Sequence, residues 1–345
     1  MAQNNNEKPL RYAHYSVPDP DFAKYKAMPN PFAELDTLSP AGMREIMSHM
    51  PVTFPYDEAI VSSVEVNHRT IKVRDGAEIK VGIYKDKDVG PNATLFFGVH
   101  GGGWVLGDYQ SERPMHLLVA KKTKSVVVGV NYRLAPEYQF PHPVNDCFDA
   151  LQWCRENADT LGINPNRIIV GGGSSGGNIV RTSIPKPRLP SNFDPIQAAA
   201  LAQKDRDEGI GAVIGQVLNI PDICHPAHFP KDKYEYSSPE QNKDAPIMPT
   251  HAAHWFWAGV DPYASPILAK SLEGLPPALV QVAGLDPIRD EGLAYCEALE
   301  DAGVPVQRKV YPGLPHAFYL FPDLKATSVF YDTVVDWILA LEKAH

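Results

Sequence analysis

Apolar runs separated by helical patterns dominate the chain from about residue 63 to its end. Residues 78–83 alternate polar and apolar positions, which predicts an early, half-exposed antiparallel strand. Other runs are apolar throughout, which is typical of strands in the buried centre of a parallel sheet. Strands alternating with helices predict an α/β fold with a mostly parallel sheet. The buried strands are expected at residues 94–99, 125–130, 167–170 and 278–282.

The same pattern divides the chain into a core and two additional segments. Residues 326–343 carry one apolar stripe at helical spacing, which predicts a final helix packed on the sheet. Residues 1–60 and 222–255 break the alternation, because both are rich in proline and aromatic residues and show only short helical patches. We interpret these two segments as the parts of a cap over a core formed by residues 61–221 and 256–345.

Composition and charge exclude several classes of protein. The 345 residues are 44% hydrophobic and 21% charged, too apolar for a disordered chain and sufficient for one large domain with embellishments. The net charge is −9, and no long basic run provides a footprint for nucleic acid or anionic lipid. No apolar run approaches the ~18 residues of a membrane helix, and the N-terminus lacks the apolar stretch of a secretory signal.

These observations predict a soluble, cytoplasmic protein with no stable membrane insertion. The cysteine content agrees with a reducing compartment, because four scattered cysteines are too few for a disulfide framework in a chain of this length. We therefore expect reduced thiols at Cys147, Cys154, Cys224 and Cys296.

A glycine-rich turn supplies the first candidate for chemistry. A predicted strand runs into residues 171–178, GGGSSGGN, and then into a helical pattern. A serine on such a sharp strand-to-helix turn needs small neighbours, as in the nucleophile elbow G-x-S-x-G. One frame centres Ser174 between Gly172 and Gly176, and another centres Ser175. Spacing leaves both frames open, and the motif alone is also compatible with a glycine-rich turn with capping serines.

A second motif, His100-Gly101-Gly102-Gly103, stands at the end of the predicted strand 94–99. Consecutive glycines leave backbone N–H groups free to point at a developing oxyanion. His100 is expected to brace this loop, because a general base would have to reach the elbow. Together, the loop and the elbow are far more specific for acyl transfer than either motif alone.

The partners of a nucleophilic serine are expected in the order acid, then histidine, each after a late strand. Asp286 follows one predicted strand, and His316 follows the next one, at residues 306–311. Asp290 and Glu291 lie one turn into the following helix, where a favourable interaction with the helix N-terminus explains them. Asp286 is therefore the preferred acid.

From about residue 94 to its end, the chain resembles the hormone-sensitive-lipase-like family of α/β-hydrolase carboxylesterases. The resemblance implies an α/β-hydrolase fold, with a mostly parallel eight-stranded sheet flanked by helices and a helical cap. The motifs that carry it are HGGG at residues 100–103, YRLAPE at 132–137 with FP at 140–141, LPPA at 275–278, DPIRDE at 286–291 and H-x-F at 316–318.

The resemblance also implies roles for individual residues. The family pattern GDSAGGN, placed on residues 172–178, makes Ser174 the nucleophile, with Asp286 and His316 completing the triad. This chain departs from the pattern at Gly173 and Ser175, where the family has Asp and Ala. The implied oxyanion donors are Gly102, Gly103 and Ser175, and the residues that support the site are His100, Gly101, Gly172 and Gly176.

A second departure follows the elbow. Residues 181–197 carry four prolines and interrupt the helical pattern that begins at residue 176. Proline inside a helix costs about 3 kcal/mol, so the helix is expected to end early. Without these residues the flanking sequences would join into one amphipathic helix, GGNIVAAALAQKDRDEG. We interpret residues 181–197 as an insertion, and its seamless flanks indicate an unspliced, intron-like segment.

These features predict a serine carboxylesterase that hydrolyses small to medium uncharged esters through an acyl-enzyme, with no cofactor and no metal. Its partner is then a small-molecule ester, and a homodimer remains open. The histidine pairs 225/228 and 251/254 lack the ligands that would complete a tetrahedral metal site. Aromatic residues of the first segment suggest an apolar pocket, although a packed cap core has the same composition. They are Tyr12, Tyr15, Phe22, Tyr25 and Phe32.

Three alternatives remain at this point. The same triad is suited to lactone or amide hydrolysis. The fold also serves non-catalytic ligand binding, as the resemblance of the family to plant hormone receptors shows, but such a receptor has no need of His316. The third alternative is an enzyme disabled by its insertion.

Overall fold

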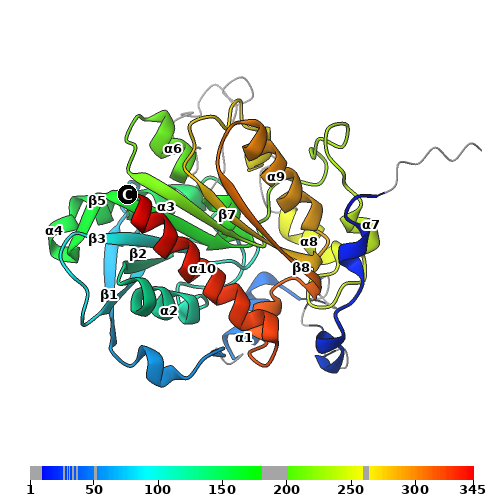
Figure 1. The fold of residues 1–345 in the computed structure, drawn as a ribbon, viewed down its shortest axis with the longest axis horizontal. Helices are drawn as coiled ribbons and strands as arrows, with labels where there is room; N and C mark the ends of the chain where they lie inside the picture. Colours follow the sequence, from blue (N-terminus) through cyan, green and yellow to red (C-terminus); the bar gives the residue numbers. More distant parts are fainter. Residues whose placement is uncertain are drawn as a thin grey trace, which may run out of the picture.

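A single sheet of eight strands forms the centre of the molecule (Figure 1). The computed structural model describes residues 10–25, 28, 30, 32, 35, 38–49, 53–180, 201–258 and 264–345. The strand order is β1-β2-β4-β3-β5-β6-β7-β8. β2 pairs antiparallel with β1 and β4, and the remaining neighbours are parallel. The strands are β1 (Val64–Lys72), β2 (Glu78–Asp86), β3 (Ala93–Val99), β4 (Val126–Asn131), β5 (Ile163–Gly173), β6 (Val213–Asn219), β7 (Ala278–Leu285) and β8 (Val306–Pro315).

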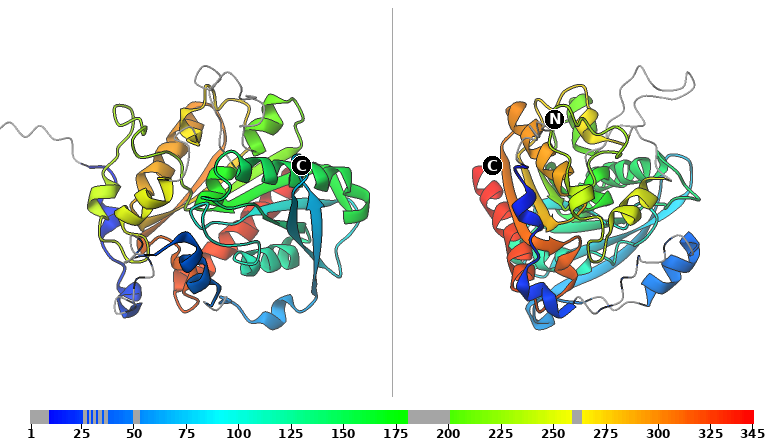
Figure 2. Two further views of the ribbon diagram at one scale, coloured as in Figure 1. Left: turned by 180° about the vertical axis from the view of Figure 1, so that it is seen from behind. Right: turned by 90° about the vertical axis from the view of Figure 1, so that its right-hand side faces the viewer.

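Helices cover both faces of this sheet (Figures 1 and 2). α2 (Arg113–Thr123) and α10 (Lys325–Ala344) share one buried apolar cluster, while α3 (His142–Glu156) and α9 (Arg289–Asp301) belong to the cluster on the opposite face. The predicted α/β-hydrolase fold is thus confirmed. The remaining α-helices are α1 (Pro40–Ser48), α4 (Ala158–Leu161), α5 (Ser175–Ile179), α6 (Leu201–Asp207), α7 (Ser238–Gln241) and α8 (Thr250–Trp257).

The two helical layers explain the burial of the strands. β3 and β4 are buried over almost their whole length, as their continuous apolar runs predict. β2 is antiparallel as predicted, but only its first residues alternate between buried and exposed. The reason is that β1 pairs with β2 along its outer edge. The strand at the end of the sheet is therefore β1, and most of its residues are exposed.

The final helix packs as its apolar stripe predicts. Phe330, Val334 and Trp337 are buried on α10, and Leu341 packs against the same cluster. α10 approaches β6 so closely that a Cβ added at Gly215 would lie 2.4 Å from Leu341 Cδ2. Within the residues that the structure describes, no helix combines the length and apolar character needed to cross a bilayer.

The helix after the elbow is short. α5 ends at Ile179 with Val180 as its C-cap, and the next described helix, α6, begins at Leu201. The predicted insertion, residues 181–197, lies outside the described residues.

The two predicted cap segments contact each other above the sheet. Leu35 and Met43 of the first segment share an apolar cluster with Met248 and Phe256 of the second. Val105, which follows the HGGG motif, belongs to the same cluster. The cap assignment remains a proposal, and this cluster supports it.

Candidate active site

Ser174 occupies the sharp turn between β5 and α5. Its backbone angles are φ 51° and ψ −121°, a conformation that costs a non-glycine residue about 1–3 kcal/mol. Glycine neighbours permit the turn, because a Cβ at Gly172 would lie 2.5 Å from the carbonyl carbon of Gly176. A Cβ at Gly176 would lie 2.2 Å from the carbonyl oxygen of Val99. The glycines on either side of Ser174 therefore let the turn sit directly against the end of β3.

The structure brings together the three residues that the sequence predicts as a triad. His316 Nε2 lies 3.1 Å from Ser174 Oγ, and His316 Nδ1 lies 2.7 Å from Asp286 Oδ2. The hydroxyl of Ser175 is buried, and it makes no hydrogen bond to His316 or Asp286. The geometry therefore favours the frame centred on Ser174.

The acid and the histidine follow adjacent parallel strands. Asp286 comes directly after β7, and its Oδ1 accepts a hydrogen bond from the N–H of Ile288 at 3.0 Å. His316 comes directly after β8. Burial by itself lowers the pKa of His316, but the charge and hydrogen bond of Asp286, together with the charge of Asp222, raise that pKa above its usual value. The Asp286 carboxylate thus stabilises the imidazolium that forms when His316 takes up a proton.

The HGGG loop lies against the elbow. A Cβ at Gly101 would lie 2.8 Å from the carbonyl oxygen of Gly173, so the loop and the elbow are in direct contact. Gly102 and Gly103 have φ values of 115° and 60°, which glycine adopts without strain. Within the described part of the chain, neither of their N–H groups donates a hydrogen bond. Both are therefore available to an oxyanion.

His100 braces this loop. Its ring is buried and stacks on the ring of Tyr132, with centroids 4.1 Å apart and planes 6° from parallel. His100 Nδ1 donates to the carbonyl oxygen of Gly101 at 2.7 Å, and the Tyr132 hydroxyl donates to the carbonyl oxygen of His100 at 2.9 Å. Burial lowers the pKa of His100 to about 4, so the ring is neutral near neutral pH. These contacts support the role that the sequence predicts for His100.

Asp290 and Glu291 make contacts that the sequence prediction did not include. Asp290 Oδ2 accepts hydrogen bonds from the N–H groups of residues 237 and 238, at 2.6 and 2.8 Å. Glu291 Oε2 accepts from those of residues 223 and 224, both at 3.0 Å. Both acids lie in the first turn of α9, but their carboxylates hold the backbone of the second cap segment beside the site.

Sequence reasoning missed Asp222. This residue follows β6, and its Oδ2 accepts a hydrogen bond from the Ser174 hydroxyl at 2.9 Å. Only 5% of Asp222 is exposed, and burial raises its pKa to about 6. One signal was available, because residues that follow neighbouring parallel strands meet at the same edge of a sheet, and β6 lies beside β5.

The aromatic residues of the first cap segment do not gather at one place. Phe32 makes an edge contact with Phe256, with ring centroids 5.7 Å apart. The Phe256 ring in turn lies where a Cβ of Gly103 would be, at 2.1 Å. Phe22 and Tyr25 instead pack on Phe321, and Tyr12 and Tyr15 lie with the main core. Of these aromatic residues, Phe32 is therefore the one linked to the HGGG loop.

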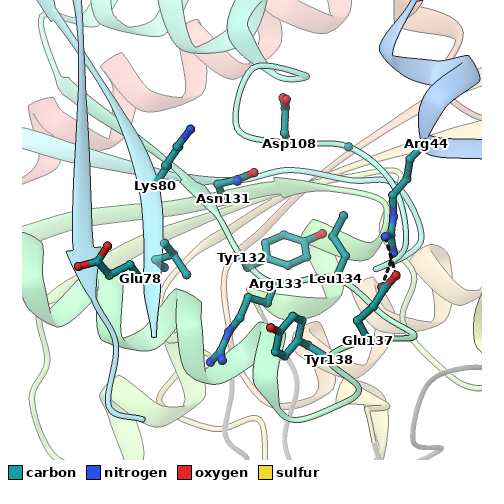
Figure 3. A pocket seen from close by; sticks show the side chains of 12 residues that line it. Arg44, Glu78, Lys80, Asp108, Asn131, Tyr132, Arg133, Leu134, Glu137 and Tyr138 are labelled. Carbon is teal, nitrogen blue, oxygen red and sulfur yellow. Dashed lines mark hydrogen bonds and ion pairs between the residues drawn. The ribbon is translucent and has the colours of Figure 1, made fainter. Parts of the chain in front are cut away.

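Arg44 of α1 ties the first cap segment to the same loop. Its Nε donates to the carbonyl oxygen of Val105 at 2.7 Å and its Nη2 to that of Ala135 at 2.5 Å. Its guanidinium also pairs with Glu137 at 2.8 Å (Figure 3). Arg44 and Glu137 border an open groove of about 560 Å³ whose lining includes Tyr132 but none of the triad residues.

The paired histidines lie in the second cap segment. His225 and His228 have ring centroids 5.5 Å apart, and the ring of His225 also contacts Trp257. In the described ranges, no group of three or more His, Cys, Asp or Glu side chains is placed to hold a metal ion.

Comparison with known proteins decides the family. A model of the α/β-hydrolase fold family matches residues 96–185 and 197–320. The chain belongs to this family. The family assignment predicted from the motifs is thus confirmed, and the match passes over residues 186–196 within the predicted insertion.

Among its relatives is a versiconal hemiacetal acetate esterase of Dothistroma septosporum, 31% identical over 315 residues that cover 88% of each chain. A carboxylesterase, NlhH, of Mycobacterium tuberculosis is 32% identical over 76% of this chain and 78% of its own. The crystal structure of vibralactone cyclase superposes with a TM-score of 0.80 and 26% identity, covering 95% of this chain and 96% of that one.

Proposed function

We propose that Ser174, His316 and Asp286 form the catalytic triad of a serine carboxylesterase. The observation that carries the proposal is the unbroken hydrogen-bonded series from Ser174 Oγ through His316 to Asp286, with distances of 3.1 and 2.7 Å. The chain is a hydrolase that acts on ester bonds, as its esterase relatives support.

Acylation begins with attack of Ser174 Oγ on the carbonyl carbon of the ester. The hydroxyl proton passes to His316 Nε2 as the new carbon–oxygen bond forms, and Asp286 stabilises the resulting imidazolium. The negative charge on the carbonyl oxygen is held by the backbone N–H groups of Gly102, Gly103 and Ser175. Collapse of the intermediate transfers the proton from His316 to the leaving alcohol.

Deacylation uses the same groups. His316 takes a proton from water, whose oxygen attacks the acyl carbon, and then returns a proton to Ser174 Oγ as the carboxylic acid leaves. Every proton transfer in this cycle is made by His316, so the proposed cycle uses neither a metal nor an organic cofactor.

The substrate class follows from the surroundings of the oxyanion loop. Phe32, Trp255 and Phe256 bring apolar rings to the cluster beside Gly103. Such surroundings suit small to medium uncharged esters. Residues 1–60 and 222–255 would then act as a cap that sets the size of the accepted acyl or alcohol group.

Lactones form the second candidate class of substrates. The similarity to vibralactone cyclase supports it, because a lactone is an internal ester that the same acyl-enzyme chemistry opens or closes. Matched linear esters and lactones of equal carbon number distinguish the two classes through their kcat/KM values.

The state of the cysteines supports the predicted compartment. Cys147, Cys154, Cys224 and Cys296 are all buried free thiols. Unpaired cysteines are typical of reducing compartments, and we therefore propose a cytoplasmic location.

Labelling with a fluorophosphonate tests the proposed function directly. We expect a single adduct, located on Ser174 by mass spectrometry, and parallel loss of hydrolysis of short-chain nitrophenyl esters. Dialysis against EDTA is expected to leave that activity unchanged. An adduct on Ser175, or activity that depends on an added divalent metal, would contradict the proposal.

A further inference from the structure

The nucleophile has two hydrogen-bond partners. Ser174 Oγ lies 2.9 Å from Asp222 Oδ2 and 3.1 Å from His316 Nε2. A serine hydroxyl carries one hydrogen, so it can donate to only one of these groups at a time. Attack requires that the hydrogen point to His316. An acceptor at Asp222 therefore competes directly with the general base.

We propose that Asp222 is a positioning residue that controls where the Ser174 hydroxyl points, and so sets the pH range of catalysis. The inference rests on the proposed role of Ser174 as nucleophile. When Asp222 is ionised, it accepts the serine hydrogen and holds it away from His316. An uncharged donor in place of the Asp222 carboxylate would instead donate to Ser174 Oγ and leave the serine hydrogen to His316.

The backbone keeps Asp222 at the nucleophile. Its N–H donates to the carbonyl oxygen of Ser174 at 3.2 Å, and the N–H of Ser174 donates to the carbonyl oxygen of Asn219 at 2.8 Å. The two following N–H groups, of residues 223 and 224, are held by the Glu291 carboxylate. The backbone of Asp222 is thus anchored on both sides, which keeps its carboxylate within reach of Ser174.

The surroundings make the protonation of Asp222 sensitive to the site. Burial raises its pKa, and the carboxylate of Asp286 raises it further, whereas His316 and the hydrogen bond of Ser174 lower it. Among the described residues, no lysine or arginine pairs with Asp222, so His316 is the group facing it that can carry a positive charge. The groups that face Asp222 are Ser174 from the elbow, His316 from the β8 end, Asp286 from the β7 end, Glu291 from α9 and Tyr132 from the β4 end.

The influence is mutual. The charge of Asp222 contributes to the raised pKa of His316, in addition to the larger contribution of Asp286. Removing the Asp222 carboxylate is therefore expected to lower the pKa of His316. A residue that only filled space would leave that pKa unchanged.

The variant Asp222→Asn keeps the shape of the side chain and, through its amide N–H, imitates the protonated acid. The first measurement is the pH dependence of kcat/KM for a short-chain nitrophenyl ester. We expect the acid limb of Asp222→Asn to move to lower pH by roughly one unit, as for loss of a nearby opposite charge. The second is the rate of fluorophosphonate labelling on the alkaline plateau, which should rise roughly five-fold once the charged competitor is gone. An unmoved acid limb or slower labelling would overturn the proposal.

Two further variants guard against indirect effects. Asp222→Ala, which removes the oxygen altogether, is expected to move the acid limb in the same direction and provides the test if Asp222→Asn fails to fold. Asp205→Asn is the matched control, because Asp205 is a buried acid that accepts hydrogen bonds from the N–H groups of Ala212 and Val213 and does not touch Ser174. Its acid limb should coincide with that of the parent.

Failure of the proposed function is separable from failure of this inference. A parent chain that neither reacts with fluorophosphonate nor hydrolyses esters contradicts the proposed function. In that case the pKa of His316, followed by NMR with His316→Gln to assign its resonance, still decides the inference. We expect a lower pKa in Asp222→Asn than in the parent, and equal values would refute it.

Discussion

The backbone N–H of Ala202 donates a hydrogen bond to the carbonyl oxygen of Val180 at 3.4 Å. Val180 closes α5, and Ala202 lies in the first turn of α6. The chain therefore leaves the end of α5 and returns to the same place, on either side of residues 181–200. The family match passes over residues 186–196, which agrees with an insertion at this position.

Deletion of residues 181–197 is expected to raise both thermal stability and esterase activity. The deletion joins Val180 to residues 198–200 and lets α5 and α6 form one helix, which gains hydrogen bonds without a second nucleation cost. A longer helix behind the elbow also holds Ser174 more firmly. We expect the Tm to rise by roughly 2 °C or more, measured by calorimetry.

A variant in which residues 186–196 are replaced by a Gly-Ser segment of equal length is the control, and it should resemble the parent. A deletion variant that is both less stable and less active would show that residues 181–197 are an integral part of the native site.

Ser174→Ala is expected to abolish ester hydrolysis, whereas Ser175→Ala should weaken it only mildly. Loss of a triad nucleophile lowers kcat by about a million-fold in comparable hydrolases. Ser175 is proposed to contribute its backbone N–H, which alanine retains. Steady-state kinetics of the two variants decides the question, and an inactive Ser175→Ala with an active Ser174→Ala would reverse the assignment.

The pH profile should show the raised pKa of His316. The histidine must be neutral to accept the serine proton, so kcat/KM falls as the pH drops through its pKa. Since Asp286 and Asp222 together outweigh the lowering effect of burial, the acid limb is expected above the ordinary imidazole value of about 6.5. A midpoint clearly below that value would contradict the electrostatic description of the site.

Arg44→Ala is expected to lower kcat more than it raises KM. The guanidinium holds the carbonyl oxygens of Val105 and Ala135, so its loss frees the segment that follows Gly103. Misplacement of oxyanion donors by a fraction of an ångström to 1 Å costs roughly 10- to 100-fold in rate. Arg11→Ala, which removes an exposed ion pair with Glu297, is the control and should behave as the parent does. Equal kinetics for both variants would refute the role of Arg44.

Phe32→Ala is expected to change KM and the preference for acyl-chain length, because Phe32 packs on the Phe256 ring beside Gly103. Tyr25→Ala removes an aromatic residue of the same cap segment that packs on Phe321, and is expected to change stability more than substrate preference. A series of nitrophenyl esters of increasing acyl length separates the two effects. An unchanged preference in Phe32→Ala would argue against a cap formed by the first segment.

Local sequence pattern determined much of this protein. Buried parallel strands appear as continuous apolar runs because helices cover both faces of the sheet, and the elbow and the HGGG loop appear as glycine clusters because no larger residue fits their turns. Asp286 and His316 could be selected because the acid and the histidine each follow a late strand of the fold. In each case the physical requirement acts on residues that are close together in the chain, and so it can be recognised in the amino-acid sequence.

Only the tertiary structure decided which distant side chains meet. Asp222 reaches Ser174 because β6 lies beside β5, and Arg44 reaches Val105 because α1 packs on the residues that follow the HGGG loop. Glu291 lies in the first turn of α9, where the sequence accounts for it by the helix N-terminus. Only the tertiary structure shows that its carboxylate accepts hydrogen bonds from the N–H groups of residues 223 and 224. Such contacts depend on how whole helices and strands pack. Packing of this kind produces no periodicity or spacing in the sequence from which the contacts could be predicted.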